Sequence, residues 1–175
     1  MVLDLSNTLV VGISATALFD MSESDQIFKT ALEADPESVI DSYRRYMEEH
    51  EDEPLSPGTG YHLAKALLDL NRHMKSGELS PLVEVVVMSR NSPDTGIRVL
   101  KTIRRDQLAI TRSAFTGGES VADYMDAFDV DLFLYQRGRR AKGDRFPAMR
   151  RCDPKGASSQ RSANPQRPGT HRFRR

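Results

Sequence analysis

The stretch VVVMSRNSPDTG, Val85 to Gly96, decides the fold class of this chain. Its apolar, β-branched beginning predicts a buried strand that ends at Ser89. Ser92 then has the residue type of a helix N-cap, and Pro93 and Asp94 suit the first turn of a helix. A buried strand that leads directly into a helix is typical of α/β proteins with a parallel sheet.

The same alternation continues on both sides of this stretch. Strand-like runs are Thr8–Ser14, Val83–Ser89, Ile110–Gly118 and Val130–Tyr135. Helical periodicity is expected from Ser22 onward, over residues 36–50 and 61–74, after Ser92, and over residues 119–128. The alternation predicts a three-layer, Rossmann-like α/β domain with a mainly parallel sheet of about four strands, joined by right-handed crossovers.

Two of these helices have specific sequence signals. Asp35 is predicted to cap the helix over residues 36–50, with Pro36 at its first position. The apolar side of that helix is expected to contain Val39, Ile40, Tyr43, Tyr46 and Met47. The apolar side of the helix over residues 61–74 is expected to contain Leu63, Leu67, Leu70 and Met74.

The charge of the chain is unevenly distributed. Lys and Arg total 25, as do Asp and Glu, yet residues 136–175 contain 13 basic and 2 acidic residues. This segment has no apolar periodicity and is rich in Pro, Gly, Ser and Gln. We therefore expect a folded domain over residues 1–135 and a disordered, Arg-rich tail over residues 136–175.

Several classes of protein are not favoured by the sequence. Cys152 is the single cysteine, so neither an intrachain disulfide nor a cysteine metal cluster is expected. The beginning of the chain lacks a basic segment typical of signal peptides, and no apolar run approaches the roughly 20 residues that span a bilayer. A cytoplasmic protein without a membrane partner is the expectation.

Polar residues follow the first three predicted strands, and ligands of parallel sheets bind beyond the carboxyl ends of the strands. The three segments are SATALFD, SRNSPD and TGG. Their candidate phosphate-binding residues are Ser14, Thr16, Ser89, Arg90, Asn91, Thr116, Gly117 and Gly118. Such residues also serve as ordinary caps and turns. Asp20 is a candidate catalytic or metal-binding carboxylate, with a helix cap as the alternative.

Five segments resemble the cytosolic 5′-nucleotidase type I family. They are VVGISATALFD, HEDEPLSPGTGYHLAKALLDLN, VEVVVMSRNSPDTGIRVLKTI, DQLAITRSAFTGGES and AFDVDLFL, which together extend over about residues 8 to 134. The resemblance implies a haloacid-dehalogenase-like fold and Mg²⁺-dependent hydrolysis of nucleoside monophosphates.

The resemblance also shows what is missing. In the family an Asp-x-Asp pair ends a strand, the first aspartate being the nucleophile and the second the acid and base. The segment ISATALFD resembles that catalytic segment, with Ser14 and Thr16 in place of the two aspartates, and Ser89 matches a phosphate-holding position. The pair in Asp129–Asp131 precedes its strand, so its carboxylates are expected at the opposite end of the sheet.

These observations leave three interpretations of function. The chain is the first, degenerate half of a 5′-nucleotidase, an incomplete domain that needs a second half-domain or another subunit, such as a second copy in a homo-oligomer, for activity. It is alternatively a non-catalytic module that binds nucleotides or phosphate. The third interpretation is an inactive fragment whose basic tail adheres to nucleic acid. The abrupt change after Tyr135 is typical of a frameshift that truncates the coding sequence, with a genuine nucleic-acid-binding arm as the alternative.

Overall fold

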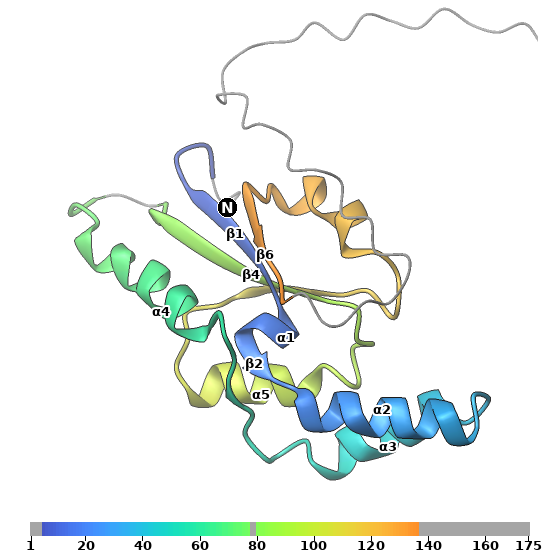
Figure 1. Cartoon of the computed structure of the whole chain (residues 1–175). Helices are drawn as coiled ribbons and strands as arrows, with labels where there is room; N and C mark the ends of the chain where they lie inside the picture. The colour runs from blue at the N-terminus through green and yellow to red at the C-terminus, as the bar shows by residue number, and fades with distance from the viewer. Residues whose placement is uncertain (1–4, 78–79, 137–175) are drawn as a thin grey trace, which may run out of the picture.

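The computed structural model describes residues 5–77 and 80–136, so the predicted tail beyond residue 136 lies outside the described residues. The strands of the main sheet are β1 (Leu9–Ser14), β4 (Val83–Ser89), β5 (Arg112–Phe115) and β6 (Leu132–Leu134). Their order is β5-β4-β1-β6, and every pair is parallel (Figure 1). The predicted α/β fold with a parallel sheet of four strands is confirmed.

The two central strands are the most buried part of the molecule. β1 pairs with β4 along its whole length, from Leu9 opposite Val83 to Ser14 opposite Met88. All seven residues of β4 are buried. A strand covered on both faces needs apolar residues in succession, which is why β4 has a continuous apolar run rather than an alternating one.

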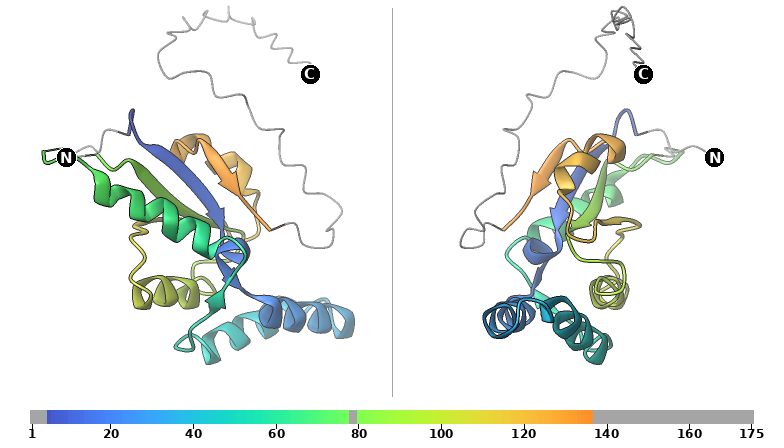
Figure 2. Two further views of the ribbon diagram at one scale, coloured as in Figure 1. Left: turned by 60° about the vertical axis from the view of Figure 1, so that its left-hand side comes forward. Right: turned by 90° about the vertical axis from the view of Figure 1, so that its right-hand side faces the viewer.

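Helical segments cover both faces of the sheet and make three layers (Figure 2). On one face lie α4 (Tyr61–Asp69), the 3₁₀ turn η1 (Leu70–His73) and α5 (Ile97–Arg105). On the other lie the 3₁₀ turns η2 (Val121–Tyr124) and η3 (Asp126–Phe128). Side chains alternate along the strands between these two cores, so each face of the sheet contributes to its own apolar cluster.

A helical insertion separates β1 from α4. It begins with one helical turn, α1 (Ala15–Leu18), and continues through the antiparallel strands β2 (Phe19–Asp20) and β3 (Ser56–Pro57). Between these strands lie α2 (Ser22–Ala34) and α3 (Val39–Glu49), which pack on each other. The α2–α3 pair extends beyond the end of the sheet to which β1 points (Figure 1).

The predicted helix beginnings are wrong by a few residues. α3 begins at Val39 rather than at Pro36, because Asp35 accepts a hydrogen bond from the Glu37 N–H at 3.1 Å and holds residues 36–38 in a turn. Likewise α5 begins at Ile97, after a turn over residues 93–96. The hydroxyl of Ser92, the expected N-cap, lies 3.0 Å from that of Thr95 instead of capping the helix.

The helix expected from Ser22 onward is confirmed as α2, whereas the segment 119–128 differs from expectation. Ser22 lies inside α2 and makes no side-chain capping bond, because the N-cap position is occupied by Met21. Residues 119–128 do not form one helix. They contain η2 and η3, which are separated by Met125, and η3 is followed by Asp129, whose φ is 55°.

The apolar sides of α3 and α4 were predicted incompletely. Leu63 and Leu70 are 50% and 45% exposed, whereas α4 buries Tyr61, Ala64 and Leu68 against the sheet. Both sides of this helix contain apolar residues, so periodicity alone could not select the buried one. Ile40 of α3 is likewise 55% exposed, while Val39 and Met47 are buried.

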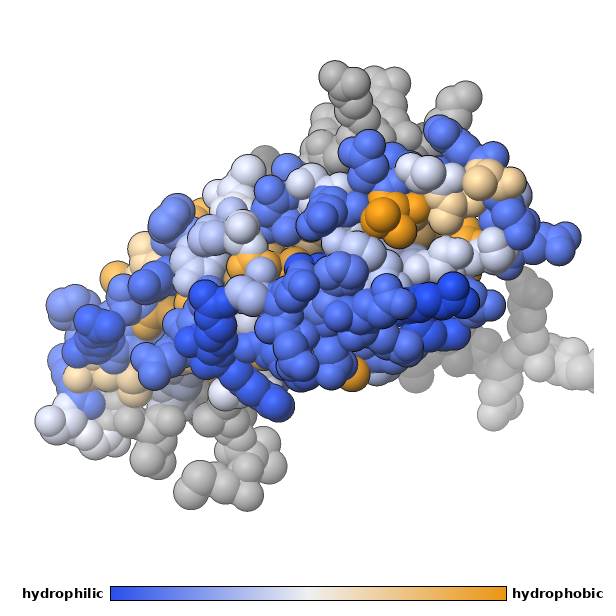
Figure 3. Space-filling model, turned by 90° about the horizontal axis from the view of Figure 1, so that it is seen from below, coloured by the Kyte–Doolittle hydropathy of each residue, from blue (hydrophilic) through white to orange (hydrophobic). Residues whose placement is uncertain are grey.

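The surface is mostly polar in the view of Figure 3, with apolar side chains in scattered groups. Across the described residues, every helix is too short or too polar to span a lipid bilayer.

Candidate functional site at the strand ends

The carboxyl ends of β1, β4 and β5 meet at one edge of the sheet. Ser14, the last residue of β1, is opposite Met88, and Ser89, the last residue of β4, is opposite Phe115, the last residue of β5. The register therefore brings together the three loops that the sequence predicted to approach a ligand. This edge also lies beside α1 and the insertion (Figure 1).

Two hydroxyl groups stand at the end of the central strand β1. Ser14 is the N-cap of α1, and its Oγ accepts a hydrogen bond from the Ala17 N–H at 3.2 Å. Thr16 Oγ1 lies 3.3 Å from Ser14 Oγ. Both side chains are half-buried, so they remain within reach of solvent. The pair is placed to offer hydroxyl donors and acceptors to a ligand, but it contains no carboxylate.

Ser89 ends β4 as a buried residue. Its Oγ accepts a hydrogen bond from the Asn91 N–H at 3.2 Å, and its carbonyl accepts one from the Thr116 N–H at 2.9 Å. The first bond shapes the loop after β4, and the second joins that loop to the end of β5. Ser89 thus has a structural role in addition to any ligand contact.

The loops after β4 and β5 hold each other. Gly117 and Gly118 have φ values of 60° and 99°, and their N–H groups donate to the carbonyls of Asn91 and Arg90 at 3.1 and 2.6 Å. The Arg90 guanidinium donates to the Gly118 carbonyl through Nε and Nη2, at 3.1 and 2.8 Å. Because the N–H groups of residues 116–118 are used within these loops, side chains are the better placed ligand contacts here.

Asn91 is the member of this group with an unused hydrogen-bond donor. Its Nδ2 is buried and makes no hydrogen bond within the described part of the chain. A buried amide nitrogen without an acceptor is uncommon, because its desolvation costs about 1–3 kcal/mol. The sequence predicted Asn91 as a site residue but gave no indication that its amide would be unpaired.

Asp20 forms its hydrogen bond with Ser22 rather than with the residues at the strand ends. It is exposed in β2, and its carboxylate accepts a hydrogen bond from the Ser22 N–H at 3.0 Å. The side chain and N–H of Ser22 lower the pKa of Asp20. Asp20 lines a cleft of about 140 Å³ at the base of the insertion. The other lining residues are Met21, Ser22, Glu23, Ser24, Pro54, Leu55, Ser56 and Arg98.

The same cleft contains a residue that the sequence did not single out. Arg98 of α5 is 6% exposed, and its Nε donates to the Glu53 carbonyl at 2.9 Å. Its Nη2 lies 3.7 Å from the Glu53 carboxylate. The buried guanidinium fastens the end of the insertion to α5. In sequence its signal is weak, because an arginine on a surface helix usually faces solvent.

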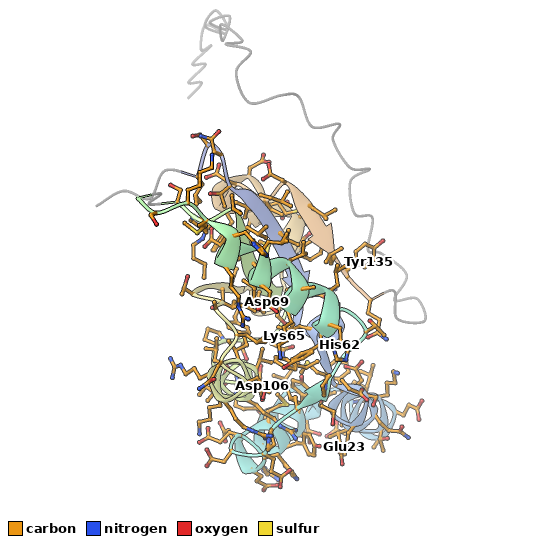
Figure 4. All side chains as sticks on the ribbon, turned by 90° about the vertical axis from the view of Figure 1, so that its left-hand side faces the viewer. Glu23, His62, Lys65, Asp69, Asp106 and Tyr135 are labelled. Atoms are coloured by element: carbon orange, nitrogen blue, oxygen red, sulfur yellow. The ribbon has the colours of Figure 1, made fainter. Side chains whose placement is uncertain are left out.

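The strand edge does not have the donors of a magnesium site. Mg²⁺ is bound chiefly by carboxylates and phosphate oxygens, whereas the edge presents hydroxyl, amide and guanidinium groups. Within residues 5–77 and 80–136, no three His, Cys, Asp or Glu side chains cluster to hold a metal. The acidic and histidine side chains labelled in Figure 4 are spread over several elements.

The aspartates of Asp129–Asp131 lie at the opposite edge, as expected. β6 begins at Leu132 and runs parallel to β1, so Asp131 is at the amino end of the strand. Its Oδ2 accepts a hydrogen bond from the Val10 N–H at 2.9 Å. This carboxylate therefore holds the beginning of the sheet and is unsuited to act at the strand ends near Ser14.

Comparison with known proteins finds a matching family model and a human relative with the same activity in its name. A model of the 5′-nucleotidase family matches residues 1–150. The human protein "Cytosolic 5′-nucleotidase 1B" is 26% identical over 132 residues, which are 73% of this chain and 20% of the human protein. The chain thus spans about a fifth of the length of this relative. No solved structure matches it.

Proposed function

Because this chain belongs to the 5′-nucleotidase family, we propose that it supplies the phosphate-binding strand edge of an enzyme that hydrolyses nucleoside monophosphates. The carboxylates that perform hydrolysis then come from outside this edge, either from a second half-domain or from another subunit, including a second copy. Residues 1–135 are the proposed folded unit.

The observation that carries the proposal is the hydroxyl pair at the end of β1. Ser14 Oγ and Thr16 Oγ1 lie 3.3 Å apart at the carboxyl end of a central parallel strand, where α/β proteins bind their ligands. Ser89 ends the neighbouring strand. Arg90 adds a permanent positive charge, which attracts a phosphate dianion.

The residues at this edge suit binding better than hydrolysis. A serine or threonine hydroxyl is a weak nucleophile unless a neighbouring base removes its proton. Among the described residues, Ser14 Oγ is hydrogen-bonded to the Ala17 N–H and the Thr16 hydroxyl, and neither is a base. Phosphoryl transfer also needs neutralisation of the phosphate charge, which Mg²⁺ supplies in the enzyme we propose. Since the donors at this edge do not fit that ion, its carboxylate ligands must come from elsewhere.

Binding and turnover of AMP by the whole chain test the proposal. We expect calorimetry to detect binding of AMP and of inorganic phosphate to the chain. Ser89→Ala and Arg90→Ala should each weaken this binding about tenfold or more. Thr30→Ala, on the exposed side of α2, is the control and should change nothing. If neither Ser89→Ala nor Arg90→Ala weakens binding, the site is wrongly assigned.

Phosphate release in the presence of Mg²⁺ separates the parts of the proposal. The chain alone should release no phosphate from AMP. Phosphate release should begin when a second half-domain or subunit that supplies the missing carboxylates is added. If the chain alone releases phosphate and Asp20→Asn abolishes that release, Asp20 is a catalytic residue. Binding that no partner converts into turnover would favour the alternative, a non-catalytic nucleotide-binding module.

We further propose a cytoplasmic location, which is supported by the word "cytosolic" in the name of the human relative. Fluorescence microscopy of the tagged chain tests it, and accumulation in a membrane or secreted fraction would contradict it.

A further inference from the structure

We propose that α4 and the turn η1 form a docking surface for a second copy of this chain, and that two copies pair through it about a two-fold axis. The surface is an apolar stripe that the sequence pattern marks as the buried side of the helix and that the fold leaves partly open. The inference goes beyond the proposed function, because such pairing needs neither a nucleotide nor the residues at the strand ends.

The stripe runs along one side of α4 and η1. It consists of Leu63, Leu67, Leu70 and Met74, which are successively four, three and four residues apart. This spacing is that of an apolar seam between two packed helices. Because a helix rises about 1.5 Å per residue, the stripe is roughly 17 Å long, and about three turns of a partner helix fit along it.

The fold of a single copy leaves the stripe partly in contact with water. Leu63 and Leu70 are 50% and 45% exposed, and Leu67 and Met74 are partly buried. The helix turns a different side toward the sheet and buries it there. Since burial of apolar surface drives association, a row of leucines that is half in water favours a partner.

The sheet has further partly exposed apolar residues at its edge, on the face that α4 covers. Leu132 and Leu134 of β6 pack against the same apolar cluster as Leu67. They are in register with Val11 and Ile13 of β1, whose side chains belong to that cluster. β6 is an edge strand of the described sheet, so this margin is also available to a partner.

The surface that best complements the stripe is the stripe of another copy. Among the described helices, α4 with η1 exposes two large apolar side chains, whereas α2, α3 and α5 expose one each, which are Leu32, Ile40 and Ile97. The segment beyond residue 136 has no apolar periodicity, so its sequence offers no matching stripe. A pair in which the same surface of both copies meets covers both stripes at once.

The charges on α4 are compatible with this pairing. Lys65 and Asp69 are two and six residues after Leu63, which places them on other sides of the helix, away from the stripe. Asp69 is also paired with Arg72 at 3.1 Å. Ala66, beside the stripe, is small enough to let two helices approach closely. Two stripes therefore meet without burying an unpaired charge or opposing like charges.

The expected dimer is weak. A contact of this length buries an area near or below the lower end of the about 1,200–2,000 Å² found in stable interfaces. We therefore expect a dissociation constant on the order of 10–100 µM. Sedimentation equilibrium of the full chain, without nucleotide and over concentrations that span this range, measures it.

Substitutions on the stripe test where the copies meet. Leu70→Lys places a charge near the middle of the stripe in both copies and should weaken the dimer about tenfold or more. Leu63→Lys should act in the same direction. Ile40→Lys is the matched control, because Ile40 is 55% exposed on α3 and lies outside the stripe. It should change the dissociation constant less than about twofold.

A mixture of opposite charges tests whether the partner is a second copy. If two stripes are centred on each other, Leu70→Lys and Leu70→Glu chains attract, and an equal mixture should associate more tightly than either variant alone. The dimer of the unaltered chain should also persist in about 0.5 M NaCl, because apolar burial is not screened by salt.

Three results would overturn the inference. The first is a chain that stays monomeric at every concentration. The second is a dimer that Leu70→Lys and Ile40→Lys affect equally. The third is a dimer that is lost in high salt, which would assign association to charges such as those of the basic tail. Thermal unfolding shows whether each variant is folded. AMP and phosphate binding are measured separately, so the phosphate-binding edge is tested independently of these results.

Discussion

Glu84 of β4 and Arg112 of β5 form a two-pronged ion pair across neighbouring strands. Arg112 Nε lies 2.6 Å from Glu84 Oε1, and Arg112 Nη2 lies 2.6 Å from Oε2. The Glu84 side chain is 8% exposed. Arg112 also donates to the Phe128 carbonyl at 3.2 Å and lies over the Phe128 ring. The pair therefore fastens the edge strand β5 and the turn η3 to the centre of the sheet.

Loss of one partner of this pair should be costly. Arg112→Leu leaves the Glu84 carboxylate buried without a counter-ion, and we expect the free energy of unfolding to fall by about 2–4 kcal/mol. Urea unfolding measures it. The double variant Glu84→Leu, Arg112→Leu should be more stable than Arg112→Leu alone, because no charge is left buried. A double variant that is less stable than the single one would contradict this account.

Ser14 should be replaceable by another capping residue. Ser14→Ala removes the acceptor of the Ala17 N–H and should lower the free energy of unfolding by about 1 kcal/mol. Ser14→Asn keeps an acceptor at the N-cap, so its cost should stay below about 0.5 kcal/mol. Urea unfolding of the two variants checks this difference. Equal losses would mean that the cap of α1 contributes little.

The stability of the chain should depend on Asp94 in acid. The Ser92 side chain and then Arg44 lower the pKa of Asp94 from 3.8 to about 2. Since this pKa is lowered in the folded state, its stabilisation is present above pH 4 and is lost as the pH falls toward 2. Asp94→Asn should remove this part of the pH dependence. The effect should be below about 1 kcal/mol, because the pair is exposed to solvent.

Thermal unfolding between pH 6 and pH 2 measures the effect of Asp94. Arg44→Met should flatten the curve less than Asp94→Asn, because the Ser92 contact remains. A greater flattening by Arg44→Met would show that the ion pair, rather than Ser92, dominates.

Gly58 should not tolerate a side chain. A Cβ at this position would lie 2.7 Å from the Ala17 carbonyl oxygen and 2.8 Å from the backbone of Phe19. The Gly58 N–H also donates to the Leu18 carbonyl at 2.9 Å, so the backbone atoms cannot easily move apart. We expect Gly58→Ala to lower the free energy of unfolding by about 1–3 kcal/mol in urea. Ser56→Ala, exposed on the same hairpin, should change it by less than about 0.5 kcal/mol.

The strands were the part of the fold that could be predicted best. The boundaries of β4 were exact, because a continuous β-branched run between turn residues has one simple interpretation. Helix beginnings were harder. Asp35 and Ser92 have good capping side chains, but they use them in turns that precede α3 and α5. Such turns depend on how the chain must approach the sheet, which local sequence does not encode.

The candidate site was predictable in part for a similar reason. Ser14 and Ser89 each end a strand, and parallel strands place their carboxyl ends at one edge of the sheet. The alternation of strands and helices was therefore enough to predict that these two residues lie at the same edge. The sequence could not predict that the loop after β4 accepts hydrogen bonds from the Gly117 and Gly118 N–H groups, because these bonds join loops that are distant in sequence.

The amino-acid sequence by itself determined the alternation of buried strands and helices, the parallel sheet and the hydroxyl residues at the strand ends. Each of these depends on local patterns of apolar and small polar residues. Only the tertiary structure decided which side of α4 is buried, where the insertion lies, and that the side-chain nitrogen of Asn91 is buried. Those features arise from the packing of distant segments, which selects one arrangement among several that the local pattern permits.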